Sequence, residues 1–177
     1  MNLYVIRHGE TERNVKGLIN GHNDGSLTEK GIKQAQEASN KIKDLEIELI
    51  FCSPLARAKE TCSHVNVNNI DVIYDKRLVE RNAGDLDSTT INNIDWDIWY
   101  DYTIDFIGNN TEGFRSVYNR IAEFLTWLKL NYNDKNILLV THGDVFKAIY
   151  LYFNPNITMN EIRAYEKKNC EIAKFDL

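Results

Sequence analysis

Two histidines stand directly after short apolar runs, at places where a folded sheet could bring them together. Arg7 and His8 follow the apolar run Leu3–Ile6, and His142 closes the apolar run Ile137–Thr141. Because ligands of open α/β sheets bind beyond the carboxyl ends of parallel strands, two strands that each end in a histidine indicate one shared site. The guanidinium beside His8 binds carboxylate or phosphate oxygens and repels metal cations, so the pair favours an anionic ligand over a metal ion.

Length and charge bound the class of protein. The chain has 177 residues, 43% of them hydrophobic, and a formal net charge of −5, which fits one globular domain over residues 1–177. The absence of a basic run disfavours nucleic acid and anionic membranes as partners. No apolar stretch has the length of a bilayer span, and no charged leader precedes Leu3, so we expect a cytoplasmic protein.

The three cysteines argue against a metal site and against disulfides. Cys52, Cys62 and Cys170 are odd in number and lack the close pairing of metal or redox motifs, which predicts free thiols. Cys52 could be proposed as a nucleophile, but its place in an apolar run favours buried packing.

Periodicity predicts strands that alternate with helices. The expected strands are Leu3–Ile6, Ile47–Cys52, Val72–Tyr74, Ile137–Thr141 and an edge strand within Cys170–Leu177. The expected helices are Thr28–Leu45, a helix from the cap and first turn at Ser53-Pro54 toward Val65, Phe114–Leu130 and Val145–Phe153. This order predicts an α/β fold, a three-layer α/β/α sandwich with a mostly parallel central sheet and an antiparallel edge strand.

Two further charged residues are expected at the same rim of the sheet. Arg57 lies in the first helical turn after the second strand, where a cation is unfavourable unless an anion is bound nearby, and Glu80 lies beyond the third strand. Cationic side chains and helix N-termini suit a phosphoryl group, and a carboxylic acid beside them can protonate a leaving oxygen. The candidate catalytic residues are therefore Arg7, His8, Arg57, Glu80 and His142.

These residues and their neighbours resemble the motifs of the histidine phosphatase superfamily, also called the phosphoglycerate mutase-like family. The matching blocks are Arg7–Thr11 with Asn14, Asn20–Asp24 with Leu27–Gly31, Ser53–Ala58, Leu78–Arg81, Glu112 ahead of Val117–Arg120 as a degraded Gly-Glu-Ser element, and Val140–Gly143. The resemblance runs through the whole chain in the family's order. A lone Arg-His-Gly triplet would be weak, whereas ordered blocks are specific.

The resemblance implies a role for each candidate. His8 would attack phosphorus and form a phosphohistidine that water hydrolyses, and Glu80 would donate a proton to the leaving alcohol. Arg7, Arg57, His142 and backbone N–H groups near Gly143 would hold the phosphoryl oxygens. His8 must keep a neutral attacking nitrogen, so its other nitrogen needs an acceptor such as a carbonyl near Gly9. The implied substrate-binding residues are Asn14, Asn20, Gly21 and Gly143, with no metal and no cofactor.

Several of these residues also have a simpler interpretation. Asn14 and Asn20 could be ordinary turn formers, and His22 is expected to be a surface residue or a satisfied hydrogen-bond donor of the core. Glu80 could pair with Arg81 on the surface.

The segment at about 84–112 is expected to be a lid-like insertion over the pocket. From Asn82 through Phe114 there is no lysine or arginine. The acidic residues there are Asp85, Asp87, Asp95, Asp97, Asp101, Asp105 and Glu112, and the aromatic ones include Trp96, Trp99, Tyr100, Tyr102 and Phe106. An anionic, aromatic lid favours a single phosphate on a neutral, aromatic or basic group. The alternative, with nearly equal weight, is that the aromatics pack as core and the acids face solvent.

The sequence thus predicts a metal-independent phosphomonoesterase that acts on a small phosphorylated metabolite, with α-ribazole phosphate or a nucleotide-like monoester as candidate substrates. One alternative is a cofactor-dependent phosphoglycerate mutase, which the missing cations of the insertion disfavour. The other is a noncatalytic phosphate-binding regulatory module, which the five intact site residues disfavour. Nothing in the sequence indicates an oligomeric state.

Overall fold

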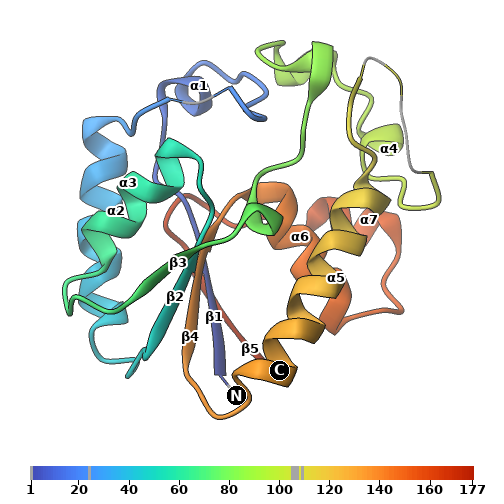
Figure 1. Ribbon diagram of the computed structural model, residues 1–177. Coiled ribbons are helices and arrows are strands. Elements are labelled where there is room, and N and C mark those ends of the chain that lie inside the picture. Colours follow the sequence, from blue (N-terminus) through green and yellow to red (C-terminus); the bar gives the residue numbers. More distant parts are fainter. Residues whose placement is uncertain (1, 24, 105–107, 109) are drawn as a thin grey trace.

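The computed structural model describes residues 2–23, 25–104, 108 and 110–177. A five-stranded sheet forms its centre, in the order β3-β2-β4-β1-β5 (Figure 1). The strands are β1 (Asn2–Arg7), β2 (Leu49–Cys52), β3 (Val72–Tyr74), β4 (Ile137–Thr141) and β5 (Ile172–Asp176). All neighbouring pairs are parallel except β1 and β5, which are antiparallel. The predicted α/β fold with an antiparallel edge strand is confirmed.

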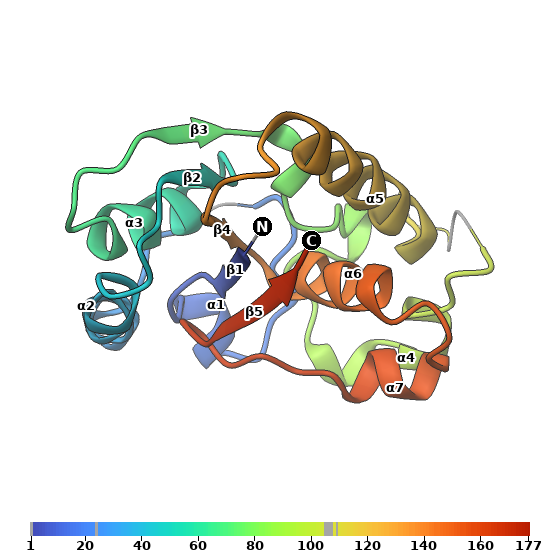
Figure 2. The same ribbon diagram turned by 90° about the horizontal axis from the view of Figure 1, so that it is seen from below.

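Helices cover both faces of the sheet, so that the molecule has three layers (Figure 2). On one side lie α2 (Glu29–Ile42) and α3 (Ala56–Val65), and on the other α5 (Phe114–Asn131) and α6 (Gly143–Phe153). Successive side chains of a strand point to opposite faces. Leu3 and Val5 of β1 accordingly join the core beneath α5 and α6, whereas Ile6 joins the core beneath α2 and α3. Each face of the sheet thus has its own apolar core.

Short elements supply the remaining regular structure. They are α1 (Glu12–Val15), α4 (Trp96–Trp99), α7 (Met159–Ala164) and the 3₁₀ turns Lys76–Leu78, Gly84–Leu86 and Ile91–Asn93. Each is at most six residues long, too short for a hydrophobic period to identify it in the sequence. In Figure 1, α1 and α4 lie beyond the carboxyl ends of the parallel strands.

Two predicted helix starts are wrong, and both errors lie at the site. Helix α3 begins at Ala56 with Leu55 as its N-cap, and the Ser53 hydroxyl ahead of it accepts from the Leu55 N–H at 3.3 Å and contacts His142 Nε2 at 2.7 Å. Helix α6 begins at Gly143, two residues before the predicted Val145, because a carboxylate from a distant loop accepts its first N–H groups. At other boundaries, β2 begins at Leu49, not at Ile47, and α2 ends at Ile42, before the predicted Leu45.

Strand register sets the two histidines beside each other. Arg7 of β1 is opposite Thr141 of β4, and the His8 N–H donates to the Thr141 carbonyl at 2.9 Å. His8 follows the alternation of Ile6, and His142 follows that of β4, so both imidazoles lie on the side of α2 and α3. Their ring centroids are 5.2 Å apart. The parallel pairing of β1 with β4 therefore brings His8 and His142 together, as the sequence predicts.

Two glycines allow the loop after β1 to pack directly on α2. A Cβ on Gly31 would overlap the carbonyl oxygen of Glu10, and a Cβ on Gly9 would lie 2.6 Å from the Gly31 carbonyl oxygen. No other residue type fits such an approach of two backbones. The loop that carries His8 is therefore fixed by backbone contact.

The insertion separates its aromatic residues from its acidic ones. Trp99 and Tyr100 are buried in the core beneath α5 and α6. The acids bind their neighbours: Asp97 pairs with Arg163 at 2.9 Å, and Asp95 caps α4. None of the described acidic residues of the insertion lines the pocket, so its expected anionic character is not found there, whereas its aromatic residues do line the pocket. The expectations for Asp105 and Phe106 lie outside the described residues.

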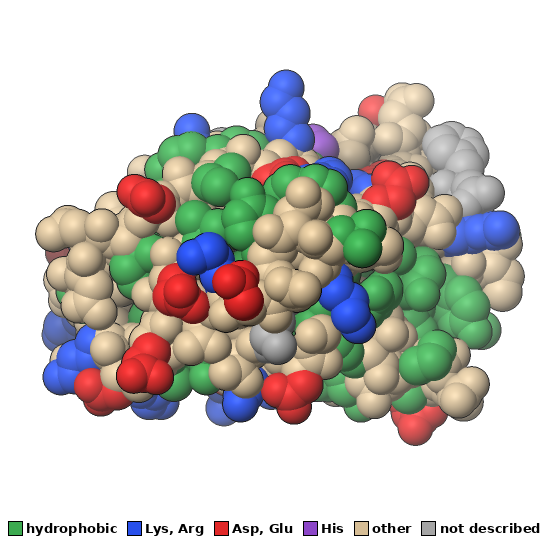
Figure 3. Space-filling model, turned by 60° about the horizontal axis from the view of Figure 1, so that its bottom comes forward, with side chains coloured by type: hydrophobic (Ala, Val, Ile, Leu, Met, Phe, Trp, Pro, Cys, Tyr) green, Lys and Arg blue, Asp and Glu red, His purple; other side chains and the backbone are tan. Residues whose placement is uncertain are grey.

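The surface mixes charges of both signs. On the face seen in Figure 3, basic and acidic side chains are interspersed among apolar and neutral ones. Within the described ranges, no helix combines the length and the apolar character needed to cross a bilayer.

Candidate active site

A pocket of about 380 Å³ opens beyond the carboxyl ends of the strands. Its inner end is lined by polar residues that the sequence singled out, and its outer part by aromatic rings of the insertion. The inner lining is Arg7, His8, Asn14, Asn20, Gly21, Glu80 and Gly143. Arg57 and His142 are fully buried, with 0% exposure, and contact His8 from beneath. The structure therefore brings all five candidate catalytic residues together.

His8 is held as a neutral imidazole with a defined tautomer. Its Nδ1 lies 2.8 Å from the Gly9 carbonyl, and since a carbonyl only accepts, Nδ1 carries the proton. This leaves a lone pair on Nε2, to which the Arg57 Nε–H donates at 3.3 Å. Burial, then the charges of Arg57 and Arg7, hold the pKa of His8 well below its usual value. The predicted carbonyl acceptor near Gly9 is confirmed.

Arg57 is fixed by the backbone of a distant loop. One terminal nitrogen of its guanidinium donates to the Asn20 carbonyl at 3.1 Å and to the Gly21 carbonyl at 2.8 Å. These carbonyls fix the orientation of the guanidinium, whose planar fork suits carboxylate or phosphate oxygens. Gly21 has no side chain because a Cβ there would lie 2.9 Å from Ala83.

His142 is a second buried imidazole without charge. Ser53 Oγ lies 2.7 Å from its Nε2, while its buried Nδ1 has no hydrogen-bond partner among the described residues. Burial, followed by the positive charge of Arg57, lowers the pKa of His142 well below its usual value. Arg7 is similar in one respect: an NH1 donates to the Lys167 carbonyl at 2.7 Å, whereas its buried Nε has no partner within the described part of the chain.

Glu80 accepts hydrogen bonds from three backbone N–H groups. Gly143 N–H donates to Oε2 at 2.9 Å, Asp144 N–H to Oε1 at 3.2 Å and Arg81 N–H to Oε1 at 3.0 Å. Burial and the Asp144 carboxylate raise the pKa of Glu80 to about 7, against the opposing charges of Arg57 and Arg7. A carboxyl with this pKa exchanges a proton at neutral pH.

The surface ion pair considered for Glu80 and Arg81 is absent between these two described side chains. Arg81 is 1% exposed, and its guanidinium donates to the Trp99 and Glu112 carbonyls, both at 2.5 Å. Arg81 thus ties the insertion to the core. His22 is exposed, as expected, although its Nε2 lies 2.7 Å from the Glu80 carbonyl.

The expected substrate-binding asparagines are partly committed to the protein. Asn14 Oδ1 accepts from the backbone N–H and the hydroxyl of Thr11, and Asn20 Nδ2 donates to the Thr11 hydroxyl at 3.2 Å. Gly143 directs its N–H to Glu80, and a Cβ on it would lie 3.7 Å from Arg7 Cζ. Whether these residues also bind substrate stays a prediction.

The cysteines do not contribute a nucleophile to this pocket. All three are free thiols, as predicted, and Cys52 is buried with 0% exposure. A hydrogen bond with Cys62, together with burial, raises the pKa of the Cys52 thiol. In the described part of the chain, no three His, Cys, Asp or Glu side chains are grouped in a way that could hold a metal ion.

Sequence reasoning missed several residues that position the site. Thr61 Oγ accepts from the Gly9 N–H at 2.9 Å and donates to the Arg57 carbonyl at 2.7 Å. Thr61 follows Arg57 by four residues, and residues with that spacing share one face of a helix, so the sequence could have indicated that Thr61 lies beside Arg57. Ser53 belongs to a matched block and Asp144 directly follows one, but the bonds that they make connect distant segments and could not be read from the sequence.

Comparisons with known proteins agree with this geometry. The family model described as "Histidine phosphatase superfamily (branch 1)" matches residues 3–177. An adenosylcobalamin/alpha-ribazole phosphatase from Escherichia coli is 31% identical over 156 residues, covering 84% of this chain and 77% of the relative. A 2,3-bisphosphoglycerate-dependent phosphoglycerate mutase from Thermoplasma acidophilum is 30% identical over 98% of this chain and 86% of its own.

A solved structure shares the fold over nearly the same extent. It is a phosphoserine phosphatase from Entamoeba histolytica in complex with 3-phosphoglyceric acid, with a TM-score of 0.87 and 27% identity over 98% of this chain and 89% of that one. The relatives thus include both phosphatases and mutases on the same scaffold. From the match over residues 3–177 and the site that these residues form, the chain belongs to the histidine phosphatase superfamily.

Proposed function

We propose that the protein is a metal-independent phosphomonoesterase that uses His8 as its nucleophile. The observation that carries the proposal is the tautomer of His8. Its Nδ1 proton is held by the Gly9 carbonyl, and its Nε2 lone pair faces a guanidinium that can also bind phosphoryl oxygens. The lowered pKa keeps this imidazole neutral, and therefore nucleophilic, at physiological pH.

The phosphoryl group is held by charge and by hydrogen-bond donors that the protein leaves available. Arg7 Nε and His142 Nδ1 are buried and have no partner in the described residues, which is costly unless a ligand supplies an acceptor. A phosphoryl oxygen is such an acceptor. By analogy with the loss of one oxyanion donor, removing one of these groups costs about 2.7–4 kcal/mol in the barrier.

The reaction proceeds in two displacements at phosphorus. In the first, a bond forms between His8 Nε2 and phosphorus while the ester P–O bond breaks, and Glu80 gives its proton to the leaving oxygen. In the second, water attacks phosphorus, loses its proton to the Glu80 carboxylate, and the P–N bond breaks to release phosphate. A carboxyl with a pKa of about 7 can serve in both directions.

The outer part of the pocket favours an ester of a neutral or basic ring. Trp96, Trp99 and Tyr100 line it. Two lysines also line it, but the ammonium of Lys147 donates to three backbone carbonyls at 2.7–3.0 Å, and that of Lys167 pairs with Glu171 at 2.8 Å.

The carboxylates of Asp144 and Glu166 place negative charge near Lys147 in this outer compartment. Among the described residues Glu166 also lines the pocket, and no salt bridge satisfies it. A second phosphate or a carboxylate on the substrate would therefore meet lysines that are already engaged by the protein. α-Ribazole phosphate and nucleotide-like monoesters meet this description, and the Escherichia coli relative is named for the first of them. The insertion at 84–112 is proposed to act as the wall over the leaving group.

A mutase is the second candidate, because the Thermoplasma acidophilum relative has that name. It would need priming by a bisphosphate and would yield isomerised product without free phosphate. The engaged lysines of the outer compartment disfavour it. A noncatalytic phosphate-binding module is disfavoured because a protein that only binds phosphate has no use for a nucleophile and a proton donor held in place.

The test is release of phosphate from p-nitrophenyl phosphate with a chelator present, followed by a panel of phosphorylated metabolites. Turnover that survives chelation and is lost in His8→Ala supports the proposal. Binding of phosphate without turnover supports the module, and dependence on added metal contradicts both. Isomerised phosphoglycerate without free phosphate would instead identify a mutase. A cytoplasmic location and a small-molecule partner stay predictions.

A further inference from the structure

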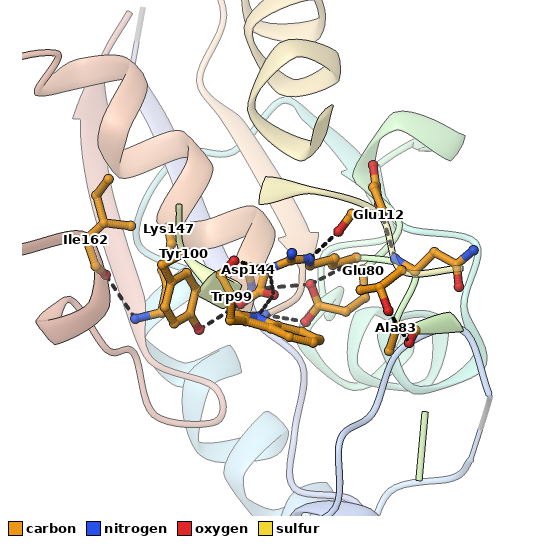
Figure 4. A network of polar contacts seen from close by, with 12 residues as sticks. Glu80, Ala83, Trp99, Tyr100, Glu112, Asp144, Lys147 and Ile162 are labelled. Carbon is orange, nitrogen blue, oxygen red and sulfur yellow. Dashed lines mark hydrogen bonds and ion pairs between the residues drawn. The ribbon is translucent and has the colours of Figure 1, made fainter. Parts of the chain in front are cut away.

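Asp144 has no part in the reaction steps above, yet three parts of the site meet on it (Figure 4). Its backbone N–H donates to Glu80 Oε1 at 3.2 Å. Its carboxylate accepts from the Trp99 indole N–H at 2.9 Å and from the Tyr100 hydroxyl at 3.0 Å. The residue is only 9% exposed. One residue therefore contacts both the candidate general acid and the aromatic wall of the pocket.

The carboxylate of Asp144 keeps much of its negative charge. Both of its short hydrogen bonds come from neutral donors, and the nearest cation, Arg81 NH1, is 3.8 Å away. Arg81 directs shorter bonds to backbone carbonyls instead. The N-terminal turn of α6 also favours an anion at this position, since the helix dipole is positive there.

We propose that Asp144 is a positioning residue for the reaction assigned to Glu80. Its backbone holds the acid, its side chain holds Trp99 and Tyr100, and its charge favours the protonated form of the acid. The distance between the acid and the wall that receives the leaving group is thereby set by one residue. This inference rests on the proposed function, and it names how that site keeps a proton available beside the leaving oxygen.

The charges around Glu80 are consistent with this role. After burial, the Asp144 carboxylate is the main cause that raises the pKa of Glu80, and Arg57 and Arg7 oppose it. Without the Asp144 carboxylate only burial would oppose the two arginines, so a larger fraction of the acid would be ionised and unable to donate a proton. The groups that face Glu80 from the surrounding elements are Arg7 on β1, Arg57 on α3, Arg81, Tyr100 and the ring of His22 on loops, and Asp144 on α6.

The test compares Asp144→Asn with wild type on two substrates. p-Nitrophenolate leaves without a proton, whereas the alkoxide of glycerol 2-phosphate needs one. We expect the alkaline decline of kcat/KM to move to lower pH by about one unit. We expect the alkyl ester to lose roughly tenfold more activity than the aryl ester, since one unit of pKa is a tenfold change. Asp97→Asn is the matched control, because it removes an equal charge from the exposed side of the insertion.

Two further measurements keep the inference testable. If Asp144→Asn does not fold, Tyr100→Phe deletes only the hydroxyl that holds the carboxylate. It should leave the pH of the decline unchanged and reduce turnover of the alkyl ester by roughly 2- to 10-fold relative to the aryl ester. Equal losses on both esters with a wild-type pH profile would overturn the inference. If wild type hydrolyses neither ester, the proposed function fails instead. In that case a ¹³C NMR titration of the Glu80 carboxyl tests the inference without turnover. The same titration midpoint in wild type and in Asp144→Asn would refute the role of Asp144.

Discussion

The ionisation of Glu80 links the structure to a measurable rate. Burial and Asp144 raise the pKa of Glu80 to about 7. For that pKa the protonated fraction is about 0.9 at pH 6, about 0.5 at pH 7 and about 0.1 at pH 8. If the protonated acid is the active form, kcat/KM for an alkyl phosphate should fall about fivefold from pH 7 to pH 8. His8 contributes no change over this range, because its lowered pKa keeps it neutral throughout.

Replacement of Glu80 by glutamine separates this titration from that of the substrate. The amide of Glu80→Gln has one accepting oxygen for the three N–H groups that now bind the carboxylate, and it has no proton to give. We expect kcat/KM for glycerol 2-phosphate to drop by roughly 10²–10⁴-fold, with a much smaller loss for p-nitrophenyl phosphate.

The pH profile of the variant is the decisive measurement. The fivefold decline between pH 7 and pH 8 should be absent in Glu80→Gln, while any change caused by ionisation of the substrate remains. A variant that keeps full turnover of the alkyl ester, or that still declines as wild type does, would refute the assignment of Glu80 as the acid.

The remaining predictions concern charge, backbone packing and stability. Arg57→Lys should lower kcat/KM by roughly 10²–10³-fold, because a lysine cannot reproduce the fork that reaches an imidazole and two carbonyls; an unchanged kcat/KM would contradict this. Gly31→Ala should reduce kcat/KM by roughly tenfold or more by displacing the loop after β1, whereas Gly25→Ala, where a Cβ meets nothing within 4 Å, should not. Lys147→Met should lower the free energy of unfolding in urea by about 3 kcal/mol, since three carbonyls lose a charged donor. Finally, the raised pKa of Glu80 makes stability depend on pH. Between pH 4.5 and about 7 the folded state keeps a proton on Glu80 that the unfolded chain, with its ordinary pKa of 4.5, has lost. The stability that this group contributes therefore falls as the pH rises through that range. The Tm of Glu80→Gln relative to wild type should therefore be higher at pH 8 than at pH 5, and an equal difference at both would contradict the raised pKa.

The fold was predictable because its information is local and periodic. The run Ile137–Thr141 is apolar up to Val140 and buried throughout, as a central parallel strand requires. Alternation along β1 divides its side chains between two cores. The apolar positions that the sequence places on one face of α5 are the ones that are buried. The convergence of His8 with His142 followed from one rule about strand ends.

The remainder depends on contacts between distant segments. Glu80 caps α6 from 63 residues away, so no signal near Val145 could have placed the helix start at Gly143. The insertion has an acidic composition, but composition does not say which way a side chain points. Asp97 faces Arg163, and the neighbouring Trp99 turns inward. The composition of the insertion therefore indicated acidic side chains from this segment on the pocket wall, whereas the carboxylates that line the pocket belong to Glu80, Asp144 and Glu166.

The strand that leads to His8 is hydrogen-bonded on both sides to strands from the far end of the chain. β1 pairs with β4 and with β5, and the Asn169 side chain donates to the His8 carbonyl at 2.9 Å. Closing loops of more than a hundred residues is slow compared with forming local contacts. We therefore expect the contacts that complete the site around His8 to form late in folding. Fragments that end before β4 cannot show partial activity, and chains cut in the middle should regain it only when both pieces associate.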